Sequence, residues 1–222
     1  MKFDQKTISI LKSFSGLNPS IIIKPGQVIS TISNSKSVIA RATTDQSFEN
    51  RFAIGDLKKL LGILSLFKEP EINIFDTYMI ISDGNRSVRY GFASEKVVKA
   101  PLDKEVDMSN VVVSFSLSDK TLDEIHKAMG VLSAPEVAIV GESGKISLST
   151  FDSKNQTSDI YSIELGETDQ AFRAVFSGDN WNFIPQSYEV ELNPKKLARF
   201  TGKDKVNINY IVAMNPVSSN FS

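Results

Sequence analysis

The chain has 222 residues, 41% hydrophobic and 23% charged, which suffices for one large globular domain or two of roughly 110 residues. The absence of Cys excludes disulfides, thiolate metal sites and cysteine nucleophiles, and a single His leaves almost no imidazole for catalysis. The net charge of −1 argues against a protein that binds phosphates over its whole surface, although it permits local contact with nucleic acid.

No targeting or membrane segment is predicted. Residues 1–12 lack the apolar core of a signal peptide, and no stretch approaches the roughly 18 apolar residues of a membrane span. We therefore expect a cytoplasmic protein.

The first half begins with a short amphipathic helix. Between Lys6 and Gly16, Ile8, Leu11 and Phe14 recur at three-residue spacing, and the Asn18-Pro19 pair ends the pattern. Runs rich in Ile, Val and Thr follow, separated by turn residues, and they predict antiparallel strands over Ser20–Lys24, Gln27–Ser33 and Ser37–Thr43.

A second helix has the strongest local pattern. Its apolar residues fall on one face, with Asp56 in the first turn and Pro70 marking the end. Lys58 and Lys59 point outward. The apolar face consists of Ile54, Leu57, Leu60, Leu61 and Leu64. Strands return at Glu71–Phe75, Thr77–Ser82 and Ser87–Ala93.

The segment from Ser94 to Asn110 is charged and contains a proline, which is typical of an exposed connector. It lies at the middle of the chain. We therefore predict one domain over 1–108, which includes the connector from about residue 94, and a second over 109–222.

The second half repeats the order of the first. A helix over Asp119–Leu132 corresponds to the first helix, and Gly144–Leu148 corresponds to Gly26–Ser30. Strands are predicted over Asp159–Gly166, Ala171–Ser177, Tyr188–Leu192 and Val206–Met214, with a short helical turn over Asp179–Ile184 and Asp179 as its N-cap. Asn193–Arg199 fits either a helix start or a hairpin.

Two features that suggest catalysis have simpler interpretations. Gly141–Lys145 has too few residues between its glycines for a phosphate loop and lacks the following hydroxyl, so a hairpin turn is favoured. His126 has no second imidazole or thiol with which to form a catalytic or metal site. We expect it to be a surface residue of the third helix, without a pocket of perturbed ionisable groups around it.

Lysines on the polar faces of the three helices offer a different kind of site. If those faces shared one surface, they would form a diffuse lining for phosphates, whereas the alternative is ordinary solvated lysines. The residues are Lys6, Lys12, Lys58, Lys59, Lys120 and Lys127. Apolar residues of the connector and the C-terminal strand either line a docking groove or pack locally.

The order of helices and strands in each half resembles the DNA sliding clamp fold. Phe52–Leu66 is similar to the second helix of the polymerase sliding clamps of T-even-type bacteriophages. Further similar segments are Ile10–Phe14, Pro185–Tyr188 and Asn209–Met214. By this resemblance Asn193–Lys196 is a turn between strands, so we choose the hairpin.

The resemblance implies an α+β protein with the DNA clamp fold. Each of two similar domains would have antiparallel sheets outside and two helices inside, and a head-to-tail homotrimer would close a ring. The ring would encircle duplex DNA without sequence specificity and tether the replicative DNA polymerase for processive synthesis. It would need neither catalysis nor a cofactor.

Further partners follow from the same resemblance. They are an ATP-driven clamp loader, late transcription factors and RNA polymerase, all in the cytoplasm of a phage-infected bacterium. The six helix lysines would face the DNA channel. Partner peptides would dock at Val97, Val98, Leu102, Ile211 and Ala213. The alternative function is a non-catalytic β-rich structural or assembly protein that does not bind DNA.

Overall fold

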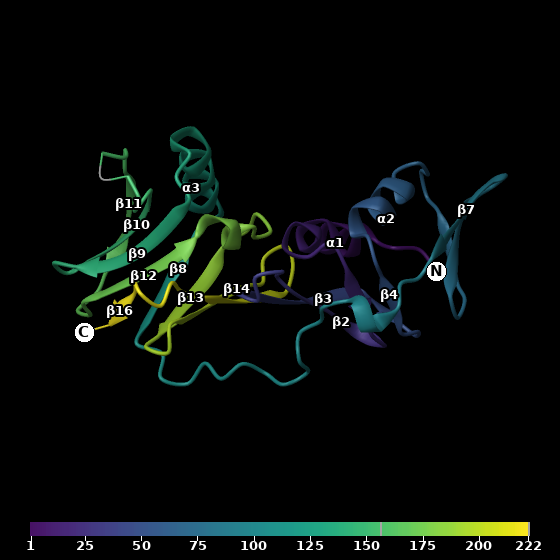
Figure 1. The fold of residues 1–222 in the computed structure, drawn as a ribbon, viewed down its shortest axis with the longest axis horizontal. Helices are drawn as coiled ribbons and strands as arrows, with labels where there is room; N and C mark the ends of the chain where they lie inside the picture. The colour runs from purple at the N-terminus through teal and green to yellow at the C-terminus, as the bar shows by residue number, and fades with distance from the viewer. Residues whose placement is uncertain (156, 222) are drawn as a thin grey trace. The chain divides into compact units, whose positions relative to one another are not determined.

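The computed structural model describes residues 1–155 and 157–221, which form two compact units (Figure 1). The first unit comprises residues 1–103 with 206–208, and the second comprises 104–205 with 209–222. The division therefore falls within the connector, five residues before the domain boundary that the sequence suggested.

The first unit contains two α-helices and four antiparallel strand pairings. Strands β1 and β4 pair, β2 and β3 pair, and β5, β6 and β7 form a sheet in that order. The elements are α1 (Gln5–Leu17), β1 (Ile21–Ile23), β2 (Gly26–Ile32), β3 (Val38–Phe48), β4 (Phe52–Ile54), α2 (Leu57–Leu64), β5 (Glu71–Ile74), β6 (Tyr78–Asp83), β7 (Arg86–Gly91) and the 3-10 helix η1 (Glu95–Val97).

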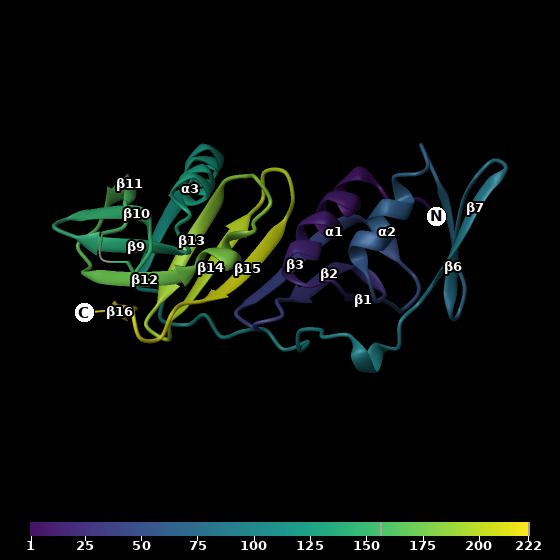
Figure 2. The same cartoon turned by 45° about the horizontal axis from the view of Figure 1, so that its top comes forward.

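Helix α1 is fixed by an N-terminal cap and one apolar face. The Asp4 carboxylate accepts a hydrogen bond from the backbone N–H of Thr7 at 2.6 Å. N–H groups in the first turn of a helix have no acceptor within the helix, so this cap provides one. Ile10, Leu11 and Phe14 are fully buried. The helix packs against α2 and β3, as two views of the ribbon show (Figures 1 and 2).

Helix α2 is shorter and is also fixed by an N-terminal cap and one apolar face. Asp56 caps it by accepting from the backbone N–H of Lys59 at 2.9 Å. Leu57, Leu60 and Leu64 are buried. Because these leucines occupy the inner face, Lys58 and Lys59 are exposed, while Leu61 and Ile63 at the sides of the helix are half-buried.

The described residues of the second unit form one α-helix and two sheet systems. Its five-stranded sheet has the order β11-β10-β9-β12-β16, and β15, β14, β13 and β8 are also consecutive neighbours. The elements are β8 (Val113–Leu117), α3 (Asp119–Leu132), β9 (Glu136–Glu142), β10 (Lys145–Phe151), β11 (Tyr161–Glu167), β12 (Phe172–Ser177), the 3-10 helix η2 (Gly178–Trp181), β13 (Tyr188–Asn193), β14 (Leu197–Gly202), β15 (Ile208–Ala213) and β16 (Asn220–Phe221).

An aromatic cluster forms much of the second core. The ring centroid of Phe183 lies 4.7 Å from those of Phe200 and Tyr210, and Trp181 meets Phe200 edge to face at 5.6 Å. Burial raises the pKa of the Tyr188 hydroxyl, which donates to the Ile184 carbonyl at 2.6 Å.

Several sequence predictions are confirmed. The third helix spans Asp119–Leu132 as expected, and Gly141–Lys145 contains the turn of the β9-β10 hairpin, with Ser143 and Gly144 at φ of 54° and 83°. The hairpin at Asn193–Lys196 also forms, because β13 and β14 pair on either side of it. The Asn193 carbonyl oxygen Oδ1 accepts from the backbone N–H of Leu197 across this turn at 3.1 Å.

The bounds of α2 differ from the prediction. Ile54 is the last residue of β4, and the helix ends at Leu64, six residues before Pro70. Ile54 continues the helical spacing of leucines by coincidence, since it is fully buried as a strand residue paired with Ile21. Periodicity alone does not separate a buried strand end from a helix start.

Residues 178–184, all of which the structure describes, form no α-helix where the second unit would need a counterpart of α2, although two helices per domain were expected. Gly178 and Asp179 directly follow β12 as Gly55 and Asp56 directly follow β4. However, η2 spans only Gly178–Trp181, and Ser177 rather than Asp179 is its N-cap. Asn is a poor helix former, and Pro185 removes a helical donor a few residues later. The chain therefore stops after a single 3-10 turn.

The packing of α2 gives a stability prediction. Replacing the fully buried Leu60 with Ala removes apolar contacts and leaves a cavity, so the free energy of unfolding should fall by about 2 to 5 kcal/mol. The control is Leu66→Ala, because Leu66 is 63% exposed and its loss should change stability by less than about 0.5 kcal/mol. Urea unfolding of both variants measures the difference; equal midpoints would contradict the burial of Leu60.

Candidate nucleic-acid interface

The helices of the first unit carry lysine charges that no carboxylate neutralises. Lys12 on α1 and Lys58 and Lys59 on α2 are exposed, and none of the described residues forms an ion pair with them. Lys6 differs, since its Nζ lies 2.7 Å from Asp45 Oδ1. The neighbouring helices α1 and α2 therefore present three uncompensated positive charges.

The lysines of α3 are compensated on their own helix. Lys120 lies 3.9 Å from Glu124, and Lys127 lies 2.5 Å from Asp123. Both pairs have the i,i+4 spacing that brings side chains together on a helix. The hydrogen bond with Asp123 raises the pKa of Lys127. The polar face of α3 is thus close to neutral.

The six sequence-predicted lysines consequently belong to two different groups. The unpaired ammonium groups on α1 and α2 can contact phosphates and release counterions from the nucleic acid. A paired lysine would first have to break its ion pair. The unpaired lysines are exposed on the helices, and no ion-pair partner for them lies in the part of the chain that the structure describes. This arrangement suits loose contact with a nucleic-acid backbone better than base recognition.

His126 is not the surface residue that the sequence suggested. Its side chain is half-buried, and its Nε2 lies 2.6 Å from the carbonyl oxygen of Trp181. A hollow of about 420 Å³ lies beside it, in which Asp179 is the other ionisable lining residue. Within residues 1–155 and 157–221, no group of three or more His, Asp or Glu side chains is placed to hold a metal ion.

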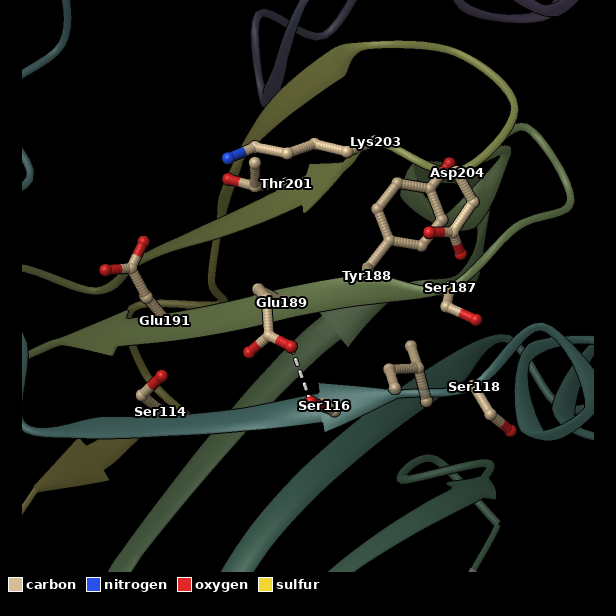
Figure 3. Close-up of a pocket in the computed structure, with 11 residues that line it drawn as sticks. Ser114, Ser116, Ser118, Ser187, Tyr188, Glu189, Glu191, Thr201, Lys203 and Asp204 are labelled. Atoms are coloured by element: carbon tan, nitrogen blue, oxygen red, sulfur yellow. Dashed lines mark hydrogen bonds between the residues drawn. The ribbon is translucent and has the colours of Figure 1, made fainter.

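A second hollow lies on the solvent side of strands β8, β13 and β14 (Figure 3). It has a volume of about 660 Å³, and its lining is largely polar. Ser116 donates to Glu189 across the two strands at 2.6 Å, and Lys203 extends over it from the end of β14. The Ser116–Glu189 contact joins directly opposed residues of β8 and β13, as cross-strand pairs on an antiparallel sheet do.

The connector is fastened to each unit by ion pairs. Glu95 receives three hydrogen bonds from the Arg51 guanidinium, at 2.8, 3.0 and 2.7 Å, which hold its pKa below the usual range. Lys24 binds Asp103, and Arg41 donates to the Leu102 carbonyl at 2.8 Å. In the second unit Lys195 binds Asp107 at 2.6 Å and lowers its pKa.

The residues predicted to dock partner peptides have different environments. Val97 and Leu102 are 76% and 81% exposed, but Val98 is buried in the first unit with Ile22 and Ala53. In the second unit Ile211 and Ala213 are half-buried. Val97 and Leu102 thus remain accessible, whereas Val98 contributes to local packing. Their role in docking stays a prediction.

Comparison with known proteins relates the chain to sliding clamps. Residues 114–216 match a family model described as gp45 sliding clamp, C terminal. The sliding clamp of Vibrio phage KVP40 is 29% identical over 96% of this chain and 98% of its own length. That of Enterobacteria phage T4 is 28% identical over 99% of both. The resemblance to phage clamps therefore extends from end to end.

Solved structures show the same fold at lower identity. The proliferating cellular nuclear antigen of Entamoeba histolytica superposes with a TM-score of 0.71 at 15% identity, over 96% of this chain and 97% of that one. The Helicobacter pylori beta clamp gives 0.68 at 14% identity, over 94% of this chain and 63% of that one. The predicted DNA clamp fold is confirmed.

The uncompensated lysines give a binding prediction. Replacing Lys58 and Lys59 with Gln removes two phosphate contacts, so the slope of log affinity against log salt should flatten by about 2 for a labelled duplex. Fluorescence anisotropy at several salt concentrations measures this slope. The matched control is Lys36→Gln with Lys203→Gln, two exposed lysines outside the helices. Equal slopes for the two variants would exclude Lys58 and Lys59 from the interface.

The ion pairs of the connector give a second prediction. Arg51→Gln should release residues 94–99 from the first unit, so trypsin should cleave after Lys96 and Lys99 several-fold faster than in the unmodified chain. Arg86→Gln is the control, because its ion pair with Asp83 lies within a hairpin. Mass spectrometry of a digestion time course identifies the cleavage sites. An unchanged rate would mean that other contacts hold the connector.

Proposed function

We propose that this chain, which is related to phage sliding clamps over its whole length and has the DNA clamp fold, is a non-catalytic clamp for a DNA polymerase. The observation that carries the proposal is the match of both units, end to end, to clamps of phage and cellular origin. A match to one unit alone would also fit a protein of different function that contains a single clamp domain.

The proposed mechanism is topological. A closed ring cannot leave duplex DNA sideways, so a polymerase bound to the ring stays near its template at an effective concentration of about millimolar. Processive synthesis then requires no bond chemistry from the clamp itself.

The charge of the helix faces suits this mechanism. Lys12, Lys58 and Lys59 are the lysines without an ion pair on the described α-helices, while the α3 lysines are paired. A few loose phosphate contacts centre the duplex without fixing its position, whereas many tight contacts would resist sliding. A near-neutral chain is therefore compatible with encircling DNA.

The finer parts of the proposal rest on the family resemblance. They are a head-to-tail homotrimer, loading by an ATP-driven clamp loader, docking of polymerase peptides at the connector, and activation of late phage transcription with RNA polymerase. These activities would take place in the cytoplasm of the infected bacterium.

A topological experiment tests the proposal. The cognate clamp loader and ATP should place the protein on a nicked circular plasmid. Protein and plasmid should then elute together from a sizing column in moderate salt. Cutting the plasmid once should release the protein, because the ring slides off the end, and blocking both ends with a bound protein should prevent release.

Two controls and one further readout complete the experiment. Omitting ATP should give no retained protein, and primer extension by the cognate polymerase on a long template should lengthen only when protein and loader are both present. If the protein stays on the plasmid after it is cut and its ends are left free, the protein binds DNA directly and does not encircle it. No retention and no gain in length would favour a structural protein that does not bind DNA.

A further inference from the structure

Acidic side chains beside the helices have two different kinds of partner. Asp4 and Asp56 cap α1 and α2, and their carboxylates accept from the backbone N–H groups of Thr7 at 2.6 Å and Lys59 at 2.9 Å. These two acids stabilise the ends of the helices, because they provide acceptors that the first turn lacks.

Three further carboxylates contact lysine side chains instead. Asp45 Oδ1 lies 2.7 Å from Lys6 Nζ, although Asp45 belongs to strand β3 and Lys6 to helix α1. On α3, Asp123 and Glu124 contact the two lysines of that helix at 2.5 and 3.9 Å. These three acids therefore neutralise three of the six helix lysines.

The position of Asp45 is the more informative, because helical spacing does not explain it. The two α3 pairs have the i,i+4 spacing that also stabilises isolated helices. Asp45, by contrast, lies 39 positions from Lys6, on a strand, where Asp is depleted. The Lys6 side chain is only 26% exposed, whereas that of Asp45 is 71% exposed. The acid thus covers a lysine of α1, a helix whose own sequence contains no acid.

The number of unpaired lysines decides how strongly the helices can hold DNA. Proteins that make roughly six to ten phosphate contacts lose about 10³- to 10⁵-fold in affinity between 50 and 200 mM salt, so they bind tightly when salt is low. Six unpaired helix lysines in one copy would reach that number. The pairs leave three in each copy. Exposed ion pairs contribute little to stability, so their effect on DNA contact is the larger one.

We propose that Asp45, Asp123 and Glu124 are positioning residues that limit the grip of the helices on DNA, since each neutralises one lysine that would otherwise contact a phosphate. The inference rests on the proposed clamp function and names residues that regulate its contact with DNA. A weaker grip lets the protein move along the duplex, because fewer phosphate contacts must be exchanged at each step. Removing one of these carboxylates should therefore tighten DNA binding.

Amide substitutions test the three acids, because they remove the charge and keep the shape. Asp45→Asn should release Lys6, so the slope of log affinity against log salt for a labelled duplex should steepen by about 1. Asp123→Asn combined with Glu124→Gln should steepen it by about 2. Asp45→Glu keeps the charge and should keep the slope of the unmodified chain. Fluorescence anisotropy at several salt concentrations measures all four proteins.

Helix α1 provides a matched pair of lysines for the same measurement. Lys12 has no ion-pair partner among the described residues, so Lys12→Gln should flatten the slope by about 1. Lys6→Gln should leave the slope nearly unchanged, because Asp45 already neutralises Lys6. In a chain that carries Lys6→Gln, Asp45→Asn should have no further effect. Equal losses for Lys6→Gln and Lys12→Gln would contradict the proposal.

Movement along DNA gives a readout that a merely structural role would not change. The protein is labelled at an introduced cysteine, since its sequence contains none, and is loaded on stretched DNA. Single-molecule tracking should show that the variant with all three amide substitutions diffuses several-fold more slowly than the unmodified chain. The control is Glu191→Gln, which frees Arg199 from an ion pair between β13 and β14, outside the helices. Its diffusion should be unchanged.

The outcomes separate this inference from the proposed function. Urea unfolding checks that each variant is folded. If the loader and ATP do not retain the unmodified chain on circular DNA, the proposed function itself is wrong. If the unmodified chain is retained but the amide variants keep its salt slope and its diffusion, only the role of the three acids is wrong.

Discussion

The one-sided burial of α1 and α2 is the constraint on which the lysine face depends. Leu57, Leu60 and Leu64 must leave water together, and burying each contributes roughly 1.5 to 3 kcal/mol. A surface ion pair contributes at most about 1 kcal/mol. Packing therefore orients α2, and Lys58 and Lys59 face solvent as a consequence. Their charge remains available for a partner because no part of the fold requires it.

Much of the fold could be predicted from local pattern. Helix α3 was predicted at its observed ends because its apolar residues recur at helical spacing, and the structure shows Ser118 capping its first turn. Glycine turns located the hairpins for a similar reason, since Gly84 and Gly144 adopt positive φ that few residues tolerate. These signals lie within a few residues of the structure that they specify.

The candidate site was harder to predict because it depends on pairs distant in sequence. The six helix lysines looked alike, yet Asp45 neutralises Lys6 from strand β3 and no spacing rule connects the two. The i,i+4 pairs of α3 were readable in principle. The attachment of the connector through Arg51 and Glu95 likewise joins residues 44 positions apart. For charges distant in sequence, only the fold determines which are compensated.

The single 3-10 turn of the second unit, where the first unit has α2, breaks the symmetry that the repeated sequence suggests. In the proposed ring, the lining would have three basic sectors, each provided by α1 and α2, that alternate with three nearly neutral sectors provided by α3. A polyanion in such a ring would be attracted most strongly by the three basic sectors. The duplex would then tilt toward one sector at a time and move between them as it is threaded through.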